Sequence, residues 1–296
     1  MKIGNSLSES FTTTLGFRQG DCLSCDLFNI ALEKVIRDAA VNRNGTIFTK
    51  SHMLLAYADD IDIMGRTLRD VTAAFAGIER QSLKMGLAVN ESITKVMVST
   101  NRKSTRLGET VNVGNYNFGV VEEFVYLGSS INKSNNISLE MRRRIIPANR
   151  CYFGINRQIR SKSLSRVTKI TLYKTLILPV LLYGAEAWVL AQADEAVLGV
   201  FERKILRKIY GPVCVSGDYR HRMNHELYEL YADIDIVKRI NEQRLRWLGH
   251  VVRMDEKALV KRIYEFNPED VRRRGRPKLR WKDQVQQHLM DLNFRN

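Results

Sequence analysis

The chain has 296 residues, of which 44% are hydrophobic and 27% are charged, a composition typical of a folded protein with a sizeable core. It therefore excludes an intrinsically disordered chain. The formal net charge is +15, and residues 141–296 carry this whole excess with 32 basic and 17 acidic side chains, whereas residues 1–140 balance at 15 of each. A basic second half favours a polyanionic partner, for which nucleic acid is the first candidate, over a merely soluble basic domain.

Membrane and secretory segments are not expected. No charged stretch followed by an apolar run opens the chain, and the most apolar stretch, residues 176–190, is short and interrupted by a proline, a glycine and a glutamate. Four scattered cysteines are too few for a disulfide framework and fit a reducing compartment. The sequence therefore predicts an intracellular protein, and neither the Cys22/Cys25 pair nor the histidines near Cys214 complete a zinc site.

In chain order, the first 131 residues mix helices with short strands. Apolar spacing and turn residues predict a polar loop at 16–22, a helix at 23–40, a hairpin at 53–57 and 61–64, a helix at 68–86, and strands at 96–98, 111–113 and 124–127. Beyond residue 131 strand signals fade, and helical periodicities occupy residues 168–190, 195–210 and 234–252. We expect helix breaks at Gly211-Pro212 and Asn267-Pro268.

The predicted hairpin has an acidic tip, with the run Tyr-Ala-Asp-Asp at residues 57–60. Adjacent carboxylates repel each other unless a cation lies between them, and Mg²⁺ prefers carboxylate and phosphate oxygens. The alternative is an ordinary turn, because Asp is favoured in turns for its local hydrogen bonding.

Motif order decides between these interpretations. The chain resembles the reverse transcriptases of LINE-type (non-LTR) retrotransposons. The runs that carry this resemblance, in the order of that family, are residues 16–24 with 27–33, 57–60, 86–90 and 126–129, and it continues through 176–184, 246–250 and 275–277.

The resemblance implies an α/β palm with a ferredoxin-like antiparallel sheet at residues 1–131. A mainly α-helical thumb and connection at 132–210 and a basic helical region at 211–296 would follow it. The implied reaction is RNA-directed DNA synthesis on an RNA template and a DNA primer from deoxynucleoside triphosphates, supported by Mg²⁺ or Mn²⁺. The oligomeric state is not readable from the sequence.

The resemblance also implies roles for individual residues. Asp59 would be a metal ligand and Asp60 a supporting carboxylate, and Tyr57 would lie near the primer end. Gln19 and Gly20 would line the nucleotide pocket, next to Arg18, which would contact template or phosphate.

Two departures from the family pattern stand out. The first palm motif, which supplies another metal-binding aspartate, has no counterpart before Gly16, and neither do the fingers or an endonuclease. We therefore expect impaired catalysis and, as the alternative, an inactive nucleic-acid-binding remnant. In addition, Ile93 stands where the family has a lysine after Asn90, and Lys95, on the same face of an expected strand, is its candidate replacement.

Two basic clusters are candidate nucleic-acid contacts. Residues 141–169 hold nine Lys and Arg and no acid, interleaved with Tyr152 and Phe153, which would either stack on bases or join the core. The preferred phosphate contacts there are Arg160, Lys162 and Arg166.

The second cluster, at residues 272–278, includes Arg274, Arg276 and Lys278 around a Gly275-Arg276-Pro277 core. It resembles both an AT-hook and a nuclear-localisation patch, and both patterns are short and common by chance. We expect Trp247 and Trp281 to pack against helices rather than stack on bases.

Overall fold

The computed structural model describes residues 2–3, 6–7, 20–41, 52–99, 108–266 and 280–292. The chain divides into two compact units. The first unit comprises Met1–Thr94 and Thr110–Gly119, and the second comprises Lys95–Glu109 and Val120–Asn296.

Helices and antiparallel hairpins build the first unit. Its elements are β1 (Lys2–Ile3), β2 (Ser6–Leu7), α1 (Ser24–Asp38), β3 (His52–Tyr57), β4 (Asp60–Gly65), α2 (Leu68–Lys84), β6 (Thr110–Val113) and β7 (Tyr116–Val120, to Gly119 in this unit). The strands pair as antiparallel hairpins β1–β2, β3–β4 and β6–β7.

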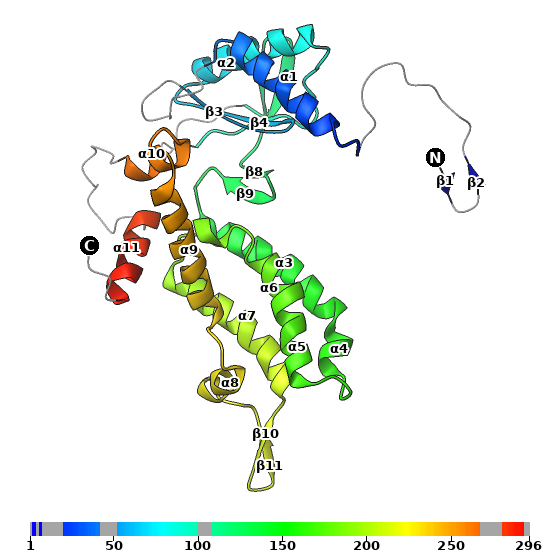
Figure 1. Ribbon diagram of the computed structural model, residues 1–296, viewed down its shortest axis with the longest axis vertical. Coiled ribbons are helices and arrows are strands. Elements are labelled where there is room, and N and C mark those ends of the chain that lie inside the picture. Colours follow the sequence, from blue (N-terminus) through cyan, green and yellow to red (C-terminus); the bar gives the residue numbers. More distant parts are fainter. Residues whose placement is uncertain are drawn as a thin grey trace. The chain divides into compact units, whose positions relative to one another are not determined.

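The core of the first unit lies between the two helices and the β3–β4 hairpin, where α1 and α2 lie together in Figure 1. Val35 of α1 and Ile78 of α2 are buried there, and Ile61 and Ile63 of β4 pack against them. Helix α2 begins after Thr67, whose hydroxyl oxygen accepts a hydrogen bond from the Asp70 amide, as an N-cap residue does. The acidic hairpin is therefore held by its apolar residues against a helix pair.

The second unit is mainly helical. Its elements are β5 (Lys95–Val96), β8 (Glu123–Tyr126), β9 (Ser129–Asn132), α3 (Ile137–Gly154), α4 (Asn156–Arg160), α5 (Arg166–Leu172), the π-helix η1 (Tyr173–Ile177), α6 (Leu178–Leu181), the 3-10 helix η2 (Ala185–Ala187), α7 (Gln192–Tyr210), β10 (Val213–Val215), β11 (Asp218–Arg220), α8 (Asn224–Tyr231), α9 (Ile236–Arg253), α10 (Leu259–Glu265) and α11 (Trp281–Asp291).

One large core serves these helices, and α7 is at its centre. The apolar residues of α7 recur at helical spacing, and Leu198, Ile205 and Leu206 are fully buried. Helix α7 ends before Gly211, which adopts a positive φ of 72°, a conformation that glycine reaches without steric conflict. The predicted class, an antiparallel α/β part followed by a mainly α-helical part, is confirmed.

Three expectations about elements need correction. Strands β7 and β9 were not predicted: β9 reads Ser-Ser-Ile-Asn and shows no alternation, whereas β7 reads Tyr-Asn-Phe-Gly-Val, an alternation that was overlooked. The predicted fading of strands beyond residue 131 is wrong at β10–β11, a hairpin that projects from the helices in Figure 1. Its turn residues Ser216 and Gly217 both have positive φ, as a two-residue type I′ turn requires.

The predicted helix at 168–190 ends earlier than expected. Helices α5, η1 and α6 follow one another without a gap from Arg166 to Leu181, with a π-helical middle, and the short η2 is separate. Pro179 lacks the amide hydrogen that an α-helical turn needs, and Gly184 takes a positive φ of 72°. These two residues explain why the apolar periodicity does not yield one helix.

The β8–β9 hairpin is fastened to the helices of the second unit. Glu140 of α3 is buried and accepts hydrogen bonds from the Ser130 amide and from Arg144 Nε, each at 2.8 Å. Tyr183 donates its hydroxyl to the Leu127 carbonyl at 2.9 Å, and the Arg144 guanidinium lies 4.6 Å from the Tyr183 ring centroid. The hairpin therefore belongs structurally to the helical unit.

Candidate active site

The acidic tip is the turn of the β3–β4 hairpin. Tyr57 pairs with Asp60 across the hairpin, so Ala58 and Asp59 form its two-residue loop. Ala58 adopts a φ of +50°, which a residue other than glycine adopts rarely. Both aspartates and the Tyr57 side chain are exposed. The hairpin thus presents two adjacent carboxylates and a phenol to solvent.

A third acid lies on the same strand and was missed by the sequence reasoning. In a strand, residues two apart share a face, so Asp62 lies on the face of Asp60, while Ile61 and Ile63 turn to the core. Burial raises the pKa of the Asp62 carboxyl above its usual range. The signal was present in the sequence, because the alternation of two isoleucines with two aspartates marks the opposite face.

The tip suits a hard divalent cation only in part. Asp59 and Asp60 offer the oxygen ligands that Mg²⁺ prefers, and Mg²⁺ is commonly held by one or two carboxylates together with substrate phosphates. Within residues 20–41, 52–99, 108–266 and 280–292, no group of three His, Cys, Asp or Glu side chains is placed to hold a metal ion. Among the residues that the structure describes, the tip therefore offers the two carboxylates of Asp59 and Asp60.

The predicted nucleotide loop is described only at its end. Gly20 is exposed and has a φ of +91°, a turn conformation just before α1. Arg18 and Gln19 lie outside the described residues.

The expectation for Ile93 and Lys95 is not supported by the structure. Ile93 lies in a turn rather than in the strand that begins at Lys95, so the two residues do not share a strand face. The turn forms because Asn90 accepts hydrogen bonds locally, through its side chain from the Ser92 amide and through its carbonyl from the Thr94 amide. The geometric reason for Lys95 as a replacement is therefore removed.

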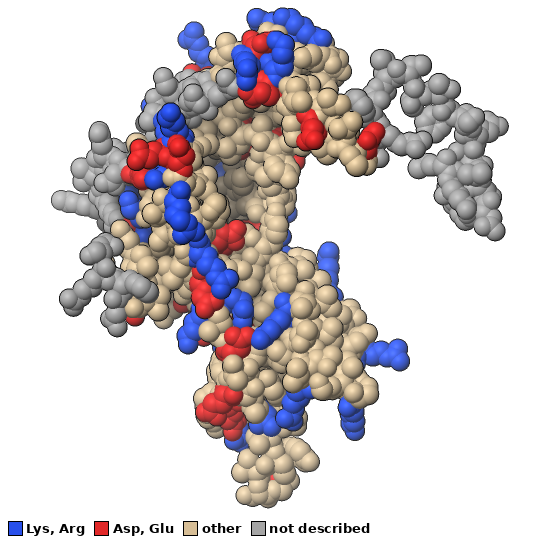
Figure 2. Space-filling model, viewed as in Figure 1, with Lys and Arg blue, Asp and Glu red and all other residues tan. Residues whose placement is uncertain are grey.

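The basic residues preferred as phosphate contacts flank one turn of the second unit. Arg160 ends α4, Arg166 begins α5, and Lys162 lies between them; all three are exposed. Arg274, Arg276 and Lys278 lie outside the described residues, as does the Gly275-Arg276-Pro277 core. Figure 2 shows further Lys and Arg side chains on the face drawn, many of them without an acid beside them.

The two aromatics between these cations have different environments. Tyr152 is buried, with 4% of its surface exposed, and belongs to the helical core, whereas 61% of Phe153 is exposed. Lys204 Nζ lies 5.4 Å from the ring centroid of Tyr152 and 5.1 Å from that of Phe153. The core alternative therefore holds for Tyr152, and only Phe153 is available for stacking.

Among the helices of the described ranges, none combines the length and the hydropathy that a bilayer crossing requires.

Comparison with known proteins identifies the first part of the chain. A family model described as "Reverse transcriptase (RNA-dependent DNA polymerase)" matches residues 1–131. Residues 1–131 are therefore similar to reverse transcriptases. The matched segment contains the acidic hairpin tip.

A relative extends the similarity into the helical unit. Over 236 residues the chain is 23% identical to an uncharacterized transposon-derived protein of Caenorhabditis elegans. The aligned part covers 79% of this chain and 84% of that protein. No solved structure matches the chain significantly.

Proposed function

We propose that the chain is a partial RNA-directed DNA polymerase of a LINE-type (non-LTR) retrotransposon, with an RNA template, a DNA primer and deoxynucleoside triphosphates as substrates. The observation that carries this proposal is the Tyr-Ala-Asp-Asp run at the exposed tip of an antiparallel hairpin, inside the segment that matches reverse transcriptases. The transposon-derived relative supports a mobile element as the origin.

In this proposal the hairpin tip is the metal-binding part of the polymerase site. Asp59 is the ligand of a divalent cation, Mg²⁺ or Mn²⁺, and Asp60 is the supporting carboxylate. Such a cation, when bound, neutralises charge on the reacting phosphates and lowers the barrier to nucleotidyl transfer. Tyr57, exposed next to the tip, packs near the primer end.

The remaining roles concern substrate positioning. Gln19 and Gly20 line the nucleotide pocket, and Arg18 contacts template or phosphate. Arg160, Lys162 and Arg166 hold the backbone of the nucleic acid, since exposed cations on a short turn can each neutralise one phosphate.

Primer extension on an RNA template tests the polymerase function. Wild type should incorporate nucleotides only weakly with Mg²⁺ or Mn²⁺, because one family aspartate has no counterpart, and Asp59→Asn should incorporate none, because the amide does not replace an anionic metal ligand. Asp38→Asn is the matched control, since Asp38 is an exposed aspartate at the end of α1 that pairs with Lys34. Equal extension by wild type and Asp59→Asn would refute the assigned role of the tip.

A second candidate is a nucleic-acid-binding protein without polymerase activity, which the basic excess of residues 141–296 favours. Absence of extension together with strong, salt-dependent binding would support it. Replacing Arg160, Lys162 and Arg166 with Gln should lower the slope of log affinity against log salt by about 0.7–0.9 per lost contact. Lys34→Gln, which removes an exposed cation of α1, should leave the slope unchanged.

A further inference from the structure

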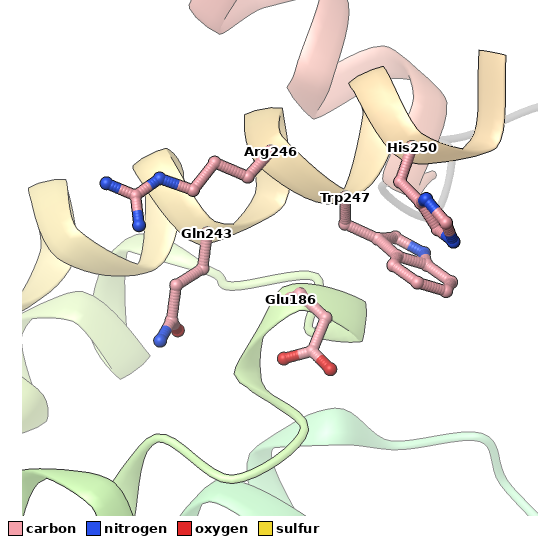
Figure 3. Close-up of a pocket in the computed structure, with 5 residues that line it drawn as sticks. All are labelled: Glu186, Gln243, Arg246, Trp247 and His250. Carbon is pink, nitrogen blue, oxygen red and sulfur yellow. The ribbon is translucent and has the colours of Figure 1, made fainter. Parts of the chain in front are cut away.

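A surface pocket of about 380 Å³ lies beside α9, far along the chain from the acidic tip. Figure 3 shows its five lining residues: Glu186 from η2, and Gln243, Arg246, Trp247 and His250 from α9. The four α9 residues follow the spacing i, i+3, i+4 and i+7, so their side chains leave one broad face of the helix. The volume is within the range of small-molecule sites, about 300–1,000 Å³.

The wall opposite α9 is fixed by α11. Trp281 Nε1 donates a hydrogen bond to the Glu186 carbonyl at 2.7 Å. The Gln284 side chain accepts from the Leu190 amide at 3.2 Å and donates to the Leu190 carbonyl at 2.5 Å. These bonds attach Glu186 and the residue four positions after it to α11, so this wall of the pocket is already formed without a ligand.

The chemistry of the lining combines a flat aromatic surface with polar groups. The half-buried indole of Trp247 lies between His250 and Glu186 in Figure 3, and its ring centroid is 5.3 Å from that of His250. Gln243 Oε1 is buried and has no hydrogen-bond partner among the described residues. Glu186 is half-buried and lines the pocket from η2, across from the α9 side chains. The pocket thus offers a stacking surface beside acceptors of hydrogen bonds.

The charge around the pocket selects the class of ligand. Arg246 is exposed, and within the described part of the chain it makes no ion pair. Arg253, also exposed, extends the cationic character along α9, and Figure 2 shows Lys and Arg side chains running over the place of this helix. A cationic ligand attracted by Glu186 alone would meet these charges, whereas a ligand with a phosphate would be attracted by them.

We propose that this pocket binds one unpaired nucleotide of a single-stranded nucleic acid. The base stacks on Trp247, its amino-bearing edge faces Glu186 and Gln243, and the adjacent phosphate lies near Arg246. This inference rests on the proposed function, since it assumes that the second unit handles nucleic acid. It also departs from the expectation that Trp247 only packs against helices, because the indole is half-buried and borders an open pocket.

Binding of the full chain to a labelled single-stranded RNA, compared with the same strand carrying abasic sites, tests the proposal. Wild type should prefer the strand with bases. Trp247→Leu should lower its affinity about 5- to 100-fold, the loss expected for one stacked base, and Trp247→Phe should lose less. Neither change should alter binding of the abasic strand, which has phosphates but nothing to stack.

Two further variants separate charge and base recognition from folding. Arg246→Gln should weaken binding of both strands, whereas Lys238→Gln, on the same helix outside the pocket, should have a smaller effect. Glu186→Gln should reduce the preference for strands rich in cytosine, whose amino group donates to a carboxylate, over strands of uracil.

The outcomes distinguish this inference from the proposed function. If wild type binds RNA but Trp247→Leu and Trp247→Phe bind it equally well, the pocket does not hold a base, and the polymerase proposal is untouched. An equal loss of binding to the abasic strand in Trp247→Leu and Trp247→Phe would likewise contradict the stacking role, because a strand without bases has nothing to stack on the indole. If wild type binds no single-stranded nucleic acid at low salt, both proposals fail together.

Discussion

Glu202 gives the sharpest test of how the helical unit is held together. This α7 carboxylate is 1% exposed and accepts three hydrogen bonds, each of 3.1 Å, from the Tyr173 hydroxyl, the Tyr228 hydroxyl and the Ile236 amide. It therefore joins η1, α8 and the first residue of α9 at one buried point. Burial and the Glu202 charge raise the pKa of Tyr228 to about 12. The hydroxyl therefore stays protonated as a donor.

Replacing Glu202 with Leu should strongly destabilise the second unit. The change leaves three donors without their acceptor, and each hydrogen bond to a charged group contributes about 1.5–3 kcal/mol. The cost of burying the carboxylate opposes this sum and reduces the net effect. We expect a net loss of about 3–6 kcal/mol, a large part of the roughly 5–15 kcal/mol that stabilises a typical domain. Glu202→Gln keeps the shape and part of the hydrogen bonding and should lose only about 1–2 kcal/mol.

Urea unfolding of the full chain, followed by circular dichroism, measures these free energies. Glu229→Leu is the matched control, because Glu229 is an exposed glutamate of α8, and its replacement should change stability by less than about 0.5 kcal/mol. A Glu202→Leu protein within about 1 kcal/mol of wild type would refute the role of this carboxylate.

The pH dependence of stability is a second test of the role of Glu202. Burial raises the pKa of Glu202 above 4.5, more than its three donors lower it. A group whose pKa is raised by folding contributes stability that is complete below the unfolded value and is lost as pH rises through the folded value. The advantage of wild type over Glu202→Gln should therefore be larger at pH 4 than at pH 7; the opposite trend would contradict the assigned cause.

Three other predictions follow from single contacts. Leu206→Ala removes a fully buried side chain and should lower the free energy of unfolding by about 2–5 kcal/mol in the same urea experiment. The Arg220 guanidinium lowers the pKa of Glu226 to about 2, so the stabilisation of β10–β11 by this ion pair should be complete above pH 4.5 and decrease toward pH 2. Amide exchange in the hairpin should become faster over this range, and Glu226→Gln should show the faster exchange already at pH 7. Tyr183→Phe removes the hydrogen bond to the Leu127 carbonyl and should speed amide exchange in β8–β9 with little change in global stability; unchanged exchange would mean that other contacts suffice.

Local sequence patterns predicted much of the fold because the apolar residues that form these patterns are the ones buried in the two cores. The alternation around Asp60 and the spacing of apolar residues in α2 and α7 each place one face against a core, so hairpin and helices appear as expected. Strand β9 was not predicted because its own residues carry no strand pattern and its pairing with β8 determines it. Strand β7 was missed although its apolar residues alternate. The prediction of one helix at residues 168–190 was wrong because the spacing of apolar residues carries no information on the backbone effects of Pro179 and Gly184.

The candidate site was predicted from its motif and only partly from its chemistry. Asp59 and Asp60 were expected at a turn, and the structure places them there. Asp62 was missed because the motif ends before it, and the surroundings of Tyr152 and Phe153 could not be separated because adjacent residues on a helix face different directions. The pocket beside Trp247 joins residues about sixty positions apart, a proximity that no local pattern encodes.

The anchoring of β8–β9 determines where the helical half can be separated from the rest of the chain. A fragment that starts at Ile137, the first residue of α3, would leave the Glu140 carboxylate without the Ser130 amide and Arg144 without its partner in the hairpin, the Gly128 carbonyl. A fragment that starts ahead of Glu123 keeps all of these groups satisfied. Anyone producing the helical half alone for crystallisation or binding work should therefore cut upstream of the hairpin, not at the helix.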